Sequence, residues 1–220
     1  MPELHAIHVG MPADYGADAI SDQPWRSGIH KTPVTGRIWV GREGLPGDGQ
    51  ENQKAHGGPF RRVLVYSAEH YPAWRTELEI ADFPYGAFGE NFTVSELTEE
   101  TVCLGDVYAV GEAVIRVAQP RQPCYKIARR WGIKDLTARV ERKGWGGWYN
   151  SVLQEGFVEV GNTFTLQERP YPEYTVAFVN DLISEKRHDP QAAGALAQID
   201  ALTDTWREKF ARIADGIESQ

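Results

Sequence analysis

The residues best suited to chemistry gather in the segment Gln119-Pro-Arg-Gln-Pro-Cys-Tyr-Lys126. A cysteine becomes a good metal ligand or nucleophile when its thiolate is stabilised, and Cys124 has Arg121 and Lys126 close by in sequence. The two prolines stiffen the backbone and restrict where the sulfur points. We expect the segment to join a strand to a short helix, whose first N–H groups also favour negative charge. Cys124 is therefore the leading candidate for metal binding or catalysis, and a small packed thiol is the alternative.

Basic side chains cluster around and after this cysteine, in a chain of 220 residues whose formal net charge is −8. Between Arg121 and Lys143, eight basic side chains accompany only Asp135 and Glu141 as acids. A solvated helix face and an anion site, for example for phosphate, both explain such a cluster. The acidic balance of the whole chain disfavours general nucleic-acid binding.

A second group of candidates lies in a glycine-rich stretch before the basic cluster. Glycine allows a ligand to approach the backbone, histidine titrates near neutral pH, and arginine pairs with phosphate. The candidates are Asp48, His56, Gly57, Gly58, Arg61 and Arg62. Their spacing matches neither a Walker loop nor a GxGxxG fingerprint. A structural turn explains the glycines nearly as well, so this stretch alone does not decide between a turn and a ligand loop.

A third group is the triplet Gly89-Glu90-Asn91. Its Glu and Asn could orient a ligand or cap a bend, and taken singly we favour the bend. The second cysteine, Cys103, has apolar neighbours and is interpreted as a packed thiol. Two cysteines are too few for a disulfide framework, and no Cys and His cluster has zinc-ligand spacing.

Taken in chain order, these segments resemble the MOSC domain, and most closely its YiiM type. The motifs are Gly-Asp, Lys-x-His-Gly-Gly-Pro, Gly-Glu-Asn, Gly-Asp, Gln-Pro-Arg-x-Pro-Cys-x-Lys and Gly-Trp, and they span roughly residues 35–166. The resemblance implies binding of the molybdenum cofactor (Mo-molybdopterin), with Cys124 as molybdenum ligand and catalytic residue. It further implies that the cofactor is bound, or its pocket shaped, by Asp48, His56, Gly57, Gly58, Arg61, Arg62, Glu90, Asn91, Arg121 and Lys126. One position departs from the pattern, since Phe60 stands where the family has Asp.

The resemblance leads to the hypothesis of a molybdenum-dependent oxidoreductase that reduces N-hydroxylated compounds such as 6-N-hydroxylaminopurine. A non-catalytic carrier of the cofactor or its sulfur is the first alternative. A metal-free cysteine enzyme with His56 as base is the second. The sequence contains no flavin, haem or iron–sulfur motif, so a separate electron-donor reductase is expected as a partner. Homodimer formation stays open.

The elements that must position these residues are short strands with few helices, a pattern typical of a mainly β fold. We expect a MOSC-like β-barrel domain over residues 1–169. The opening thirty residues are rich in Gly, Pro and Asp and show little sustained apolar alternation, whereas the six glycines between Gly41 and Gly58 predict long loops. Predicted strands lie at 35–40, 62–66, 88–94, 102–104, 107–110, 113–118, 149–153 and 157–166, and predicted helices at 67–80, 123–131 and 134–142.

The sequence pattern changes at Pro170-Tyr-Pro172, which we interpret as a hinge. Apolar residues beyond it recur at helical spacing and predict a C-terminal three-helix module over residues 170–220. No apolar run reaches the length of a membrane span, and the N-terminus does not have the composition of a signal peptide. We therefore expect a cytoplasmic protein with neither a membrane nor a nucleic acid as partner.

Overall fold

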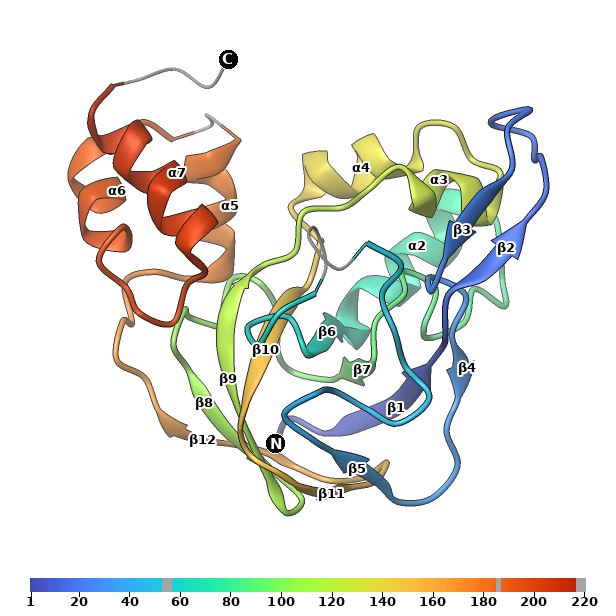
Figure 1. Ribbon diagram of the computed structural model, residues 1–220, viewed down its shortest axis with the longest axis horizontal. Helices are drawn as coiled ribbons and strands as arrows, with labels where there is room; N and C mark the ends of the chain where they lie inside the picture. The colour runs from blue at the N-terminus through green and yellow to red at the C-terminus, as the bar shows by residue number, and fades with distance from the viewer. Residues whose placement is uncertain (53–56, 185–186, 217–220) are drawn as a thin grey trace.

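The structure, a computed structural model, describes residues 1–52, 57–184 and 187–216. Its centre is an eight-stranded sheet with the strand order β12-β8-β9-β10-β6-β7-β1-β4 (Figure 1). Neighbouring strands run antiparallel except β6 and β7, which are parallel. The strands of this sheet are β1 (Leu4–Val9), β4 (Thr32–Pro33), β6 (Val63–Ser67), β7 (Phe92–Val94), β8 (Val107–Val110), β9 (Ala113–Pro120), β10 (Trp148–Gln154) and β12 (Phe164–Glu168).

The sheet curls until strands from its two ends approach one another. An isolated bridge joins Glu3 to Thr163, and Leu4 N donates to the Asn162 carbonyl at 2.9 Å. The start of β1 thus meets the turn that precedes β12. Within the described residues no continuous ladder joins the two outer strands, so the sheet is curled and open. The predicted mainly β class is confirmed, and the barrel is an incomplete one.

The first thirty residues contain strands, although their sequence shows little of the apolar alternation that marks a strand. Besides β1, they form the hairpin of β2 (Ala13–Tyr15) and β3 (Trp25–Ser27). A register shift between Leu4 and Ala6, where β1 pairs with β7, interrupts the two-residue alternation that marks a strand in sequence. Pairing with β4 and β7 therefore defines this strand, and the alternation of its own residues does not reveal it.

The strand β6 is buried along its whole length because both faces of the sheet are covered there. Val63 and Val65 belong to the main core, whereas Tyr66 belongs to a second, aromatic cluster with Tyr71 and Trp74. The latter two come from α2 (Tyr71–Leu78), which follows the short helix η1 (Ala68–His70). This double burial fixes β6, against which the candidate site is built.

Several of the other predicted elements differ in extent from the structure. The predicted strand 102–104 is a single bridge at Cys103, and 157–166 divides into β11 (Gly156–Val158) and β12. The strand β11 pairs with β5 (Ile38–Val40) in a separate two-stranded ribbon. The helix predicted from residue 123 begins later, as α3 (Lys126–Trp131), followed by α4 (Leu136–Lys143).

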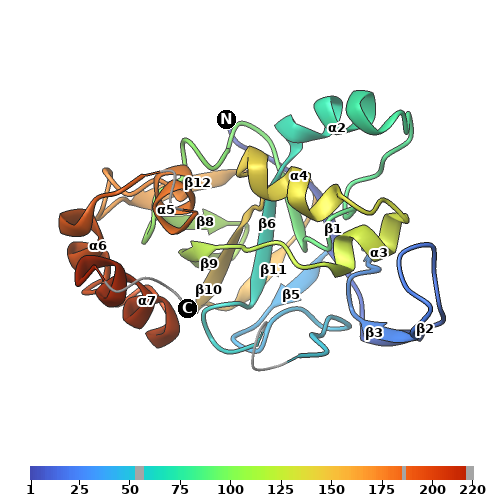
Figure 2. The same ribbon diagram turned by 90° about the horizontal axis from the view of Figure 1, so that it is seen from above.

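The C-terminal part contains the three predicted helices, α5 (Val176–Ile183), α6 (Pro190–Leu196) and α7 (Asp204–Ala214). They lie together beside β8 and β9 (Figures 1 and 2). Apolar side chains of these helices share one cluster with the side chains of the sheet. The domain boundary at residue 170 stays a prediction. None of the helices in the described ranges has the length and apolar character needed to cross a membrane.

Candidate functional site

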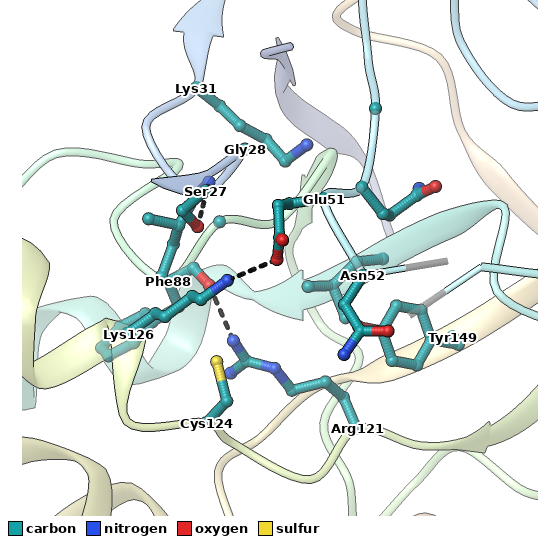
Figure 3. A pocket seen from close by; sticks show the side chains of 15 residues that line it. Ser27, Gly28, Lys31, Glu51, Asn52, Phe88, Arg121, Cys124, Lys126 and Tyr149 are labelled. Carbon is teal, nitrogen blue, oxygen red and sulfur yellow. Dashed lines mark hydrogen bonds and ion pairs between the residues drawn. The ribbon is translucent and has the colours of Figure 1, made fainter. Parts of the chain in front are cut away.

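A hollow of about 530 Å³, its open mouth included, lies where loops from both halves of the sheet converge (Figure 3). Three of its described lining residues are cationic and one is acidic. The lining residues are Ser27, Gly28, Ile29, Lys31, Gly49, Gln50, Glu51, Asn52, Leu64, Phe88, Gly89, Arg121, Cys124, Lys126 and Tyr149. The hollow thus combines a thiol with a surplus of positive charge, as an anion-binding site requires.

Arg121 comes directly after β9 and is 5% exposed. Its Nη2 donates to the Phe88 carbonyl at 3.0 Å, while its Nη1 is buried without a hydrogen-bond acceptor among the described residues. A buried N–H donor left without an acceptor costs free energy, which an anionic ligand in the hollow would remove. Figure 3 shows the guanidinium reaching into the hollow beside Cys124.

Cys124 is a free, half-buried cysteine in the loop between β9 and α3. Its carbonyl accepts from Ile127 N at 3.1 Å and from Thr137 Oγ1 at 3.2 Å. Contacts from α3 and α4 therefore hold the backbone that carries the sulfur. The cysteine lies two residues before α3 and not inside it, so its position comes from the loop.

A tight glycine loop supports the Cys124 loop from behind. Arg121 N donates to the Gly147 carbonyl at 2.9 Å, and Gly147 N donates to Glu99 Oε1 at 2.8 Å. A Cβ on Gly146 would lie 2.3 Å from the Arg121 carbonyl, so no side chain fits there. This close approach explains why consecutive glycines precede β10.

The two lysines of the hollow each pair with a carboxylate. Lys126 Nζ lies 2.9 Å from Glu51 Oε2 and donates to the Arg26 carbonyl at 2.8 Å. Lys31 pairs with Asp48 in a contact where both side chains are almost fully buried. Burial lowers the pKa of the Lys31 ammonium, and the charge of Asp48 opposes that shift. Asp48 therefore reaches the hollow only through its lysine.

Tyr149, from β10, adds a phenol to the wall of the hollow. Burial raises the pKa of this phenol above its ordinary value of 10, while the charge of the Arg121 guanidinium opposes the shift. The hydroxyl consequently keeps its proton at neutral pH and can donate a hydrogen bond to a ligand.

Glu90 lies behind the hollow, fully buried, and organises the loop that forms its rim. Its carboxylate accepts from Gly86 N at 2.7 Å, from Phe88 N at 3.1 Å and from Thr93 Oγ1 at 3.1 Å. Tyr71 donates its hydroxyl to the same carboxylate. Glu90 thereby holds the Phe88 carbonyl in place for Arg121.

Asn91 links strands rather than facing the hollow. Its Oδ1 accepts from Leu64 N at 3.0 Å, and its Nδ2 donates to the His8 carbonyl at 3.2 Å. The side chain thus joins β6 to β1 beneath the site. In the triplet Gly89-Glu90-Asn91, only the glycine lines the hollow.

The remaining predicted residues come from the glycine-rich stretch. Arg62 pairs with Glu43 at 3.0 Å, and the Arg61 Nε donates to the side-chain oxygen of Gln119 at 3.2 Å when that amide takes the orientation that suits its neighbours. In that orientation Gln119 also accepts from Trp206 Nε1 at 2.9 Å, which ties α7 to the sheet. Gly57, Gly58, Phe60, Arg61 and Arg62 are absent from the lining, and His56 lies outside the described residues.

The structure brings Arg121, Cys124 and Lys126 together on one hollow, with Asp48 behind it. Sequence reasoning missed several polar lining residues, among them Lys31, Glu51, Asn52 and Tyr149. None of them belongs to a motif, and their side chains reach the site only because distant segments meet there. Tyr149 and Lys31 lie in segments without a recognisable motif, so the residues around them in sequence do not indicate a binding site.

Comparisons with known proteins agree with this geometry. The MOSC domain profile matches residues 52–165, and the profile described as "YiiM-like, 3-alpha helix domain" matches residues 175–212. The crystal structure of YiiM from Geobacillus stearothermophilus superposes with a TM-score of 0.81 at 33% identity, covering 97% of this chain and 100% of that one.

Two sequence relatives extend the comparison. Protein YflK of Bacillus subtilis (strain 168) is 41% identical over 87% of this chain and 86% of its own length. A protein of Gibberella moniliformis (strain M3125 / FGSC 7600) described as "Reductase" is 37% identical over 71% of this chain. The match spans 28% of the length of the fungal protein.

Proposed function

The chain belongs to the MOSC domain family and carries its YiiM-like three-helix domain, and on this basis we propose that it is a molybdenum-cofactor-dependent reductase of N-hydroxylated compounds. The family is associated with binding of the molybdenum cofactor. The relative described as a reductase supports redox chemistry. The observation that carries the proposal is the buried Arg121 Nη1, which has no acceptor in the described part of the chain, beside the free thiol of Cys124.

The residues of the hollow fit such a cofactor by their chemistry. A thiolate is a soft ligand that suits a metal centre with sulfur donors, and Cys124 provides it. Arg121, Lys31 and Lys126 provide the positive charge that the phosphate of a pterin cofactor needs. The cofactor would be held by these four residues, with Cys124 as the ligand of molybdenum.

The reaction adds two electrons and two protons to R–NHOH, breaks the N–O bond and releases R–NH₂ and water. When bound, the cofactor supplies a centre that accepts and passes on two electrons. The chain contributes the orientation of the ligand, and the Tyr149 hydroxyl, which keeps its proton because burial raises its pKa, would donate a hydrogen bond to it. We assign the electron supply to a separate reductase protein, which dithionite-reduced methyl viologen can replace in an assay.

The proposal is tested by comparing Cys124→Ala with the wild-type protein after expression in a host that makes the cofactor. Molybdenum and pterin contents are measured in fresh protein, and 6-N-hydroxylaminopurine is supplied with reduced viologen. We expect at least roughly tenfold less molybdenum in the variant, because a metal ligand is removed. Cys103→Ala is the matched control, since Cys103 is buried elsewhere and donates to the Pro172 carbonyl.

Three results would contradict parts of the proposal. Equal molybdenum content in wild type and Cys124→Ala would exclude Cys124 as the ligand. Stable cofactor binding without conversion of 6-N-hydroxylaminopurine to 6-aminopurine would favour the non-catalytic carrier. Full activity of metal-depleted protein would instead favour a metal-free cysteine enzyme.

A further inference from the structure

Glu51 is the single acidic residue among the described residues that line the hollow. Its carboxylate extends toward the centre of the hollow, where Figure 3 marks its contact with Lys126. The pair is close, with Oε2 and Nζ 2.9 Å apart. The Glu51 carboxylate is therefore paired with the Lys126 ammonium, which an anionic ligand in the hollow would otherwise bind.

The two carboxylate–lysine pairs of the site differ in how firmly they are held. Asp48 is 4% exposed and also accepts from Gly10 N at 2.9 Å, so it is held by both charge and backbone. The Glu51 side chain is 35% exposed, and Lys126 is the one contact of its carboxylate within the described part of the chain. Glu51 can consequently leave its lysine while Asp48 stays in place.

We propose that Glu51 sets the affinity of the hollow for anionic ligands by acting as a built-in competitor for Lys126. The carboxylate holds the ammonium in the empty site, and a ligand gains Lys126 only when its own anion displaces Glu51. The inference deepens the proposed function and rests on it, since it assigns Lys126 to the anionic group of the ligand.

The charges of the site indicate which anions can displace Glu51 from Lys126. A monoanion such as acetate would replace one carboxylate by another at Lys126 and gains little there. A phosphate dianion brings twice the charge and can also accept from the buried Arg121 Nη1. The site therefore favours phosphate monoesters over monoanions, and the cost of displacing Glu51 lowers the affinity for any anion that takes Lys126.

The expected size of the effect follows from the exposure of the pair. Partly exposed ion pairs shift equilibria by up to about fivefold. Removing the carboxylate as Glu51→Gln should thus tighten binding of inorganic phosphate on the order of fivefold, with a smaller gain at high salt. The gain in phosphate affinity should vanish in a Lys126→Met background, because Glu51 then has no ammonium to pair with.

The experiment uses the full chain purified from a host that cannot make the cofactor. Protection of Cys124 from iodoacetamide reports binding of inorganic phosphate, with acetate as the monoanion. The proteins are wild type, Glu51→Gln, Lys126→Met, the double variant, and Glu168→Gln as a charge-matched control. Glu168 is exposed on β12 and does not line the hollow.

The inference predicts tighter phosphate binding in Glu51→Gln alone, with Glu168→Gln equal to wild type. An unchanged affinity in Glu51→Gln would overturn it. The same gain in the Lys126→Met background would also overturn it, because the effect would then come from long-range charge. Phosphate binding without these differences, or absence of phosphate binding in every protein, overturns the inference, whereas the proposed function is decided separately by molybdenum content and turnover.

Discussion

Replacing the buried carboxylate of Glu90 by an amide should destabilise the fold and loosen the rim of the hollow. Glu90 is 0% exposed and receives hydrogen bonds from two backbone N–H groups and two hydroxyls. In Glu90→Gln, one oxygen can keep part of this set, but the new NH₂ group faces at least one donor. Hydrogen bonds to a charged group are worth about 1.5–3 kcal/mol and neutral ones about 0.5–1.5 kcal/mol. Allowing for the easier burial of a neutral side chain, we expect a loss of about 3 kcal/mol.

Urea unfolding followed by tryptophan fluorescence measures this loss, since Trp74 lies in the neighbouring aromatic cluster. Thr93→Val is the matched control, because it removes a single donor from the same carboxylate and should cost about 1.5 kcal/mol, the lower end for a hydrogen bond to a charged group. Phosphate affinity should fall in Glu90→Gln, since Phe88 then no longer presents its carbonyl to Arg121. A loss below about 1 kcal/mol would refute the reasoning and mean that other contacts hold this loop.

Two further predictions concern a titrating histidine and a crowded glycine. Burial lowers the pKa of His8 below its ordinary value of 6.5, so the unfolded chain takes up a proton that the folded chain resists. The free energy of unfolding should therefore fall as pH drops below about 6.5, by up to about 1.4 kcal/mol per pH unit for this group. His8→Gln should reduce that slope in urea titrations at about pH 7 and about pH 5.5, and an unchanged slope would assign it to other groups. Gly147→Ala should lower the melting temperature more than Gly161→Ala. Both glycines have positive φ, but only a Cβ on Gly147 would meet the Val65 carbonyl, at 2.4 Å. Equal losses of melting temperature would show that the structure relieves this clash.

The strand-to-helix position of Cys124 was predictable because local signals surround it. The apolar residues of β8 and β9 alternate as a hairpin requires, and the prolines near Cys124 prevent regular structure. The three C-terminal helices were predictable for a similar reason, since their apolar residues recur at helical spacing. These features depend on neighbours in sequence, which a single chain displays directly.

The strand β1 and the role of Glu90 were not predictable in this way. The bulge between Leu4 and Ala6 removes the alternation from β1. The acceptor function of Glu90 depends on donors that the fold brings close, and the motif Gly-Glu-Asn describes only the bend. Lys31 and Tyr149 reach the hollow from segments far apart in the chain and belong to no pattern.

The sequence by itself determined the mainly β class, the three-helix C-terminal part, and a thiol beside two cationic side chains, because each depends on spacing within a short segment. The tertiary structure alone decided that the buried Arg121 Nη1 has no acceptor among the described residues, that Lys31 is paired with Asp48, and that Glu51 is paired with Lys126. The physical reason is that burial and ion pairing depend on which distant surfaces meet. Those contacts surround Cys124 with cationic side chains and place the Glu51 carboxylate on one of them, Lys126.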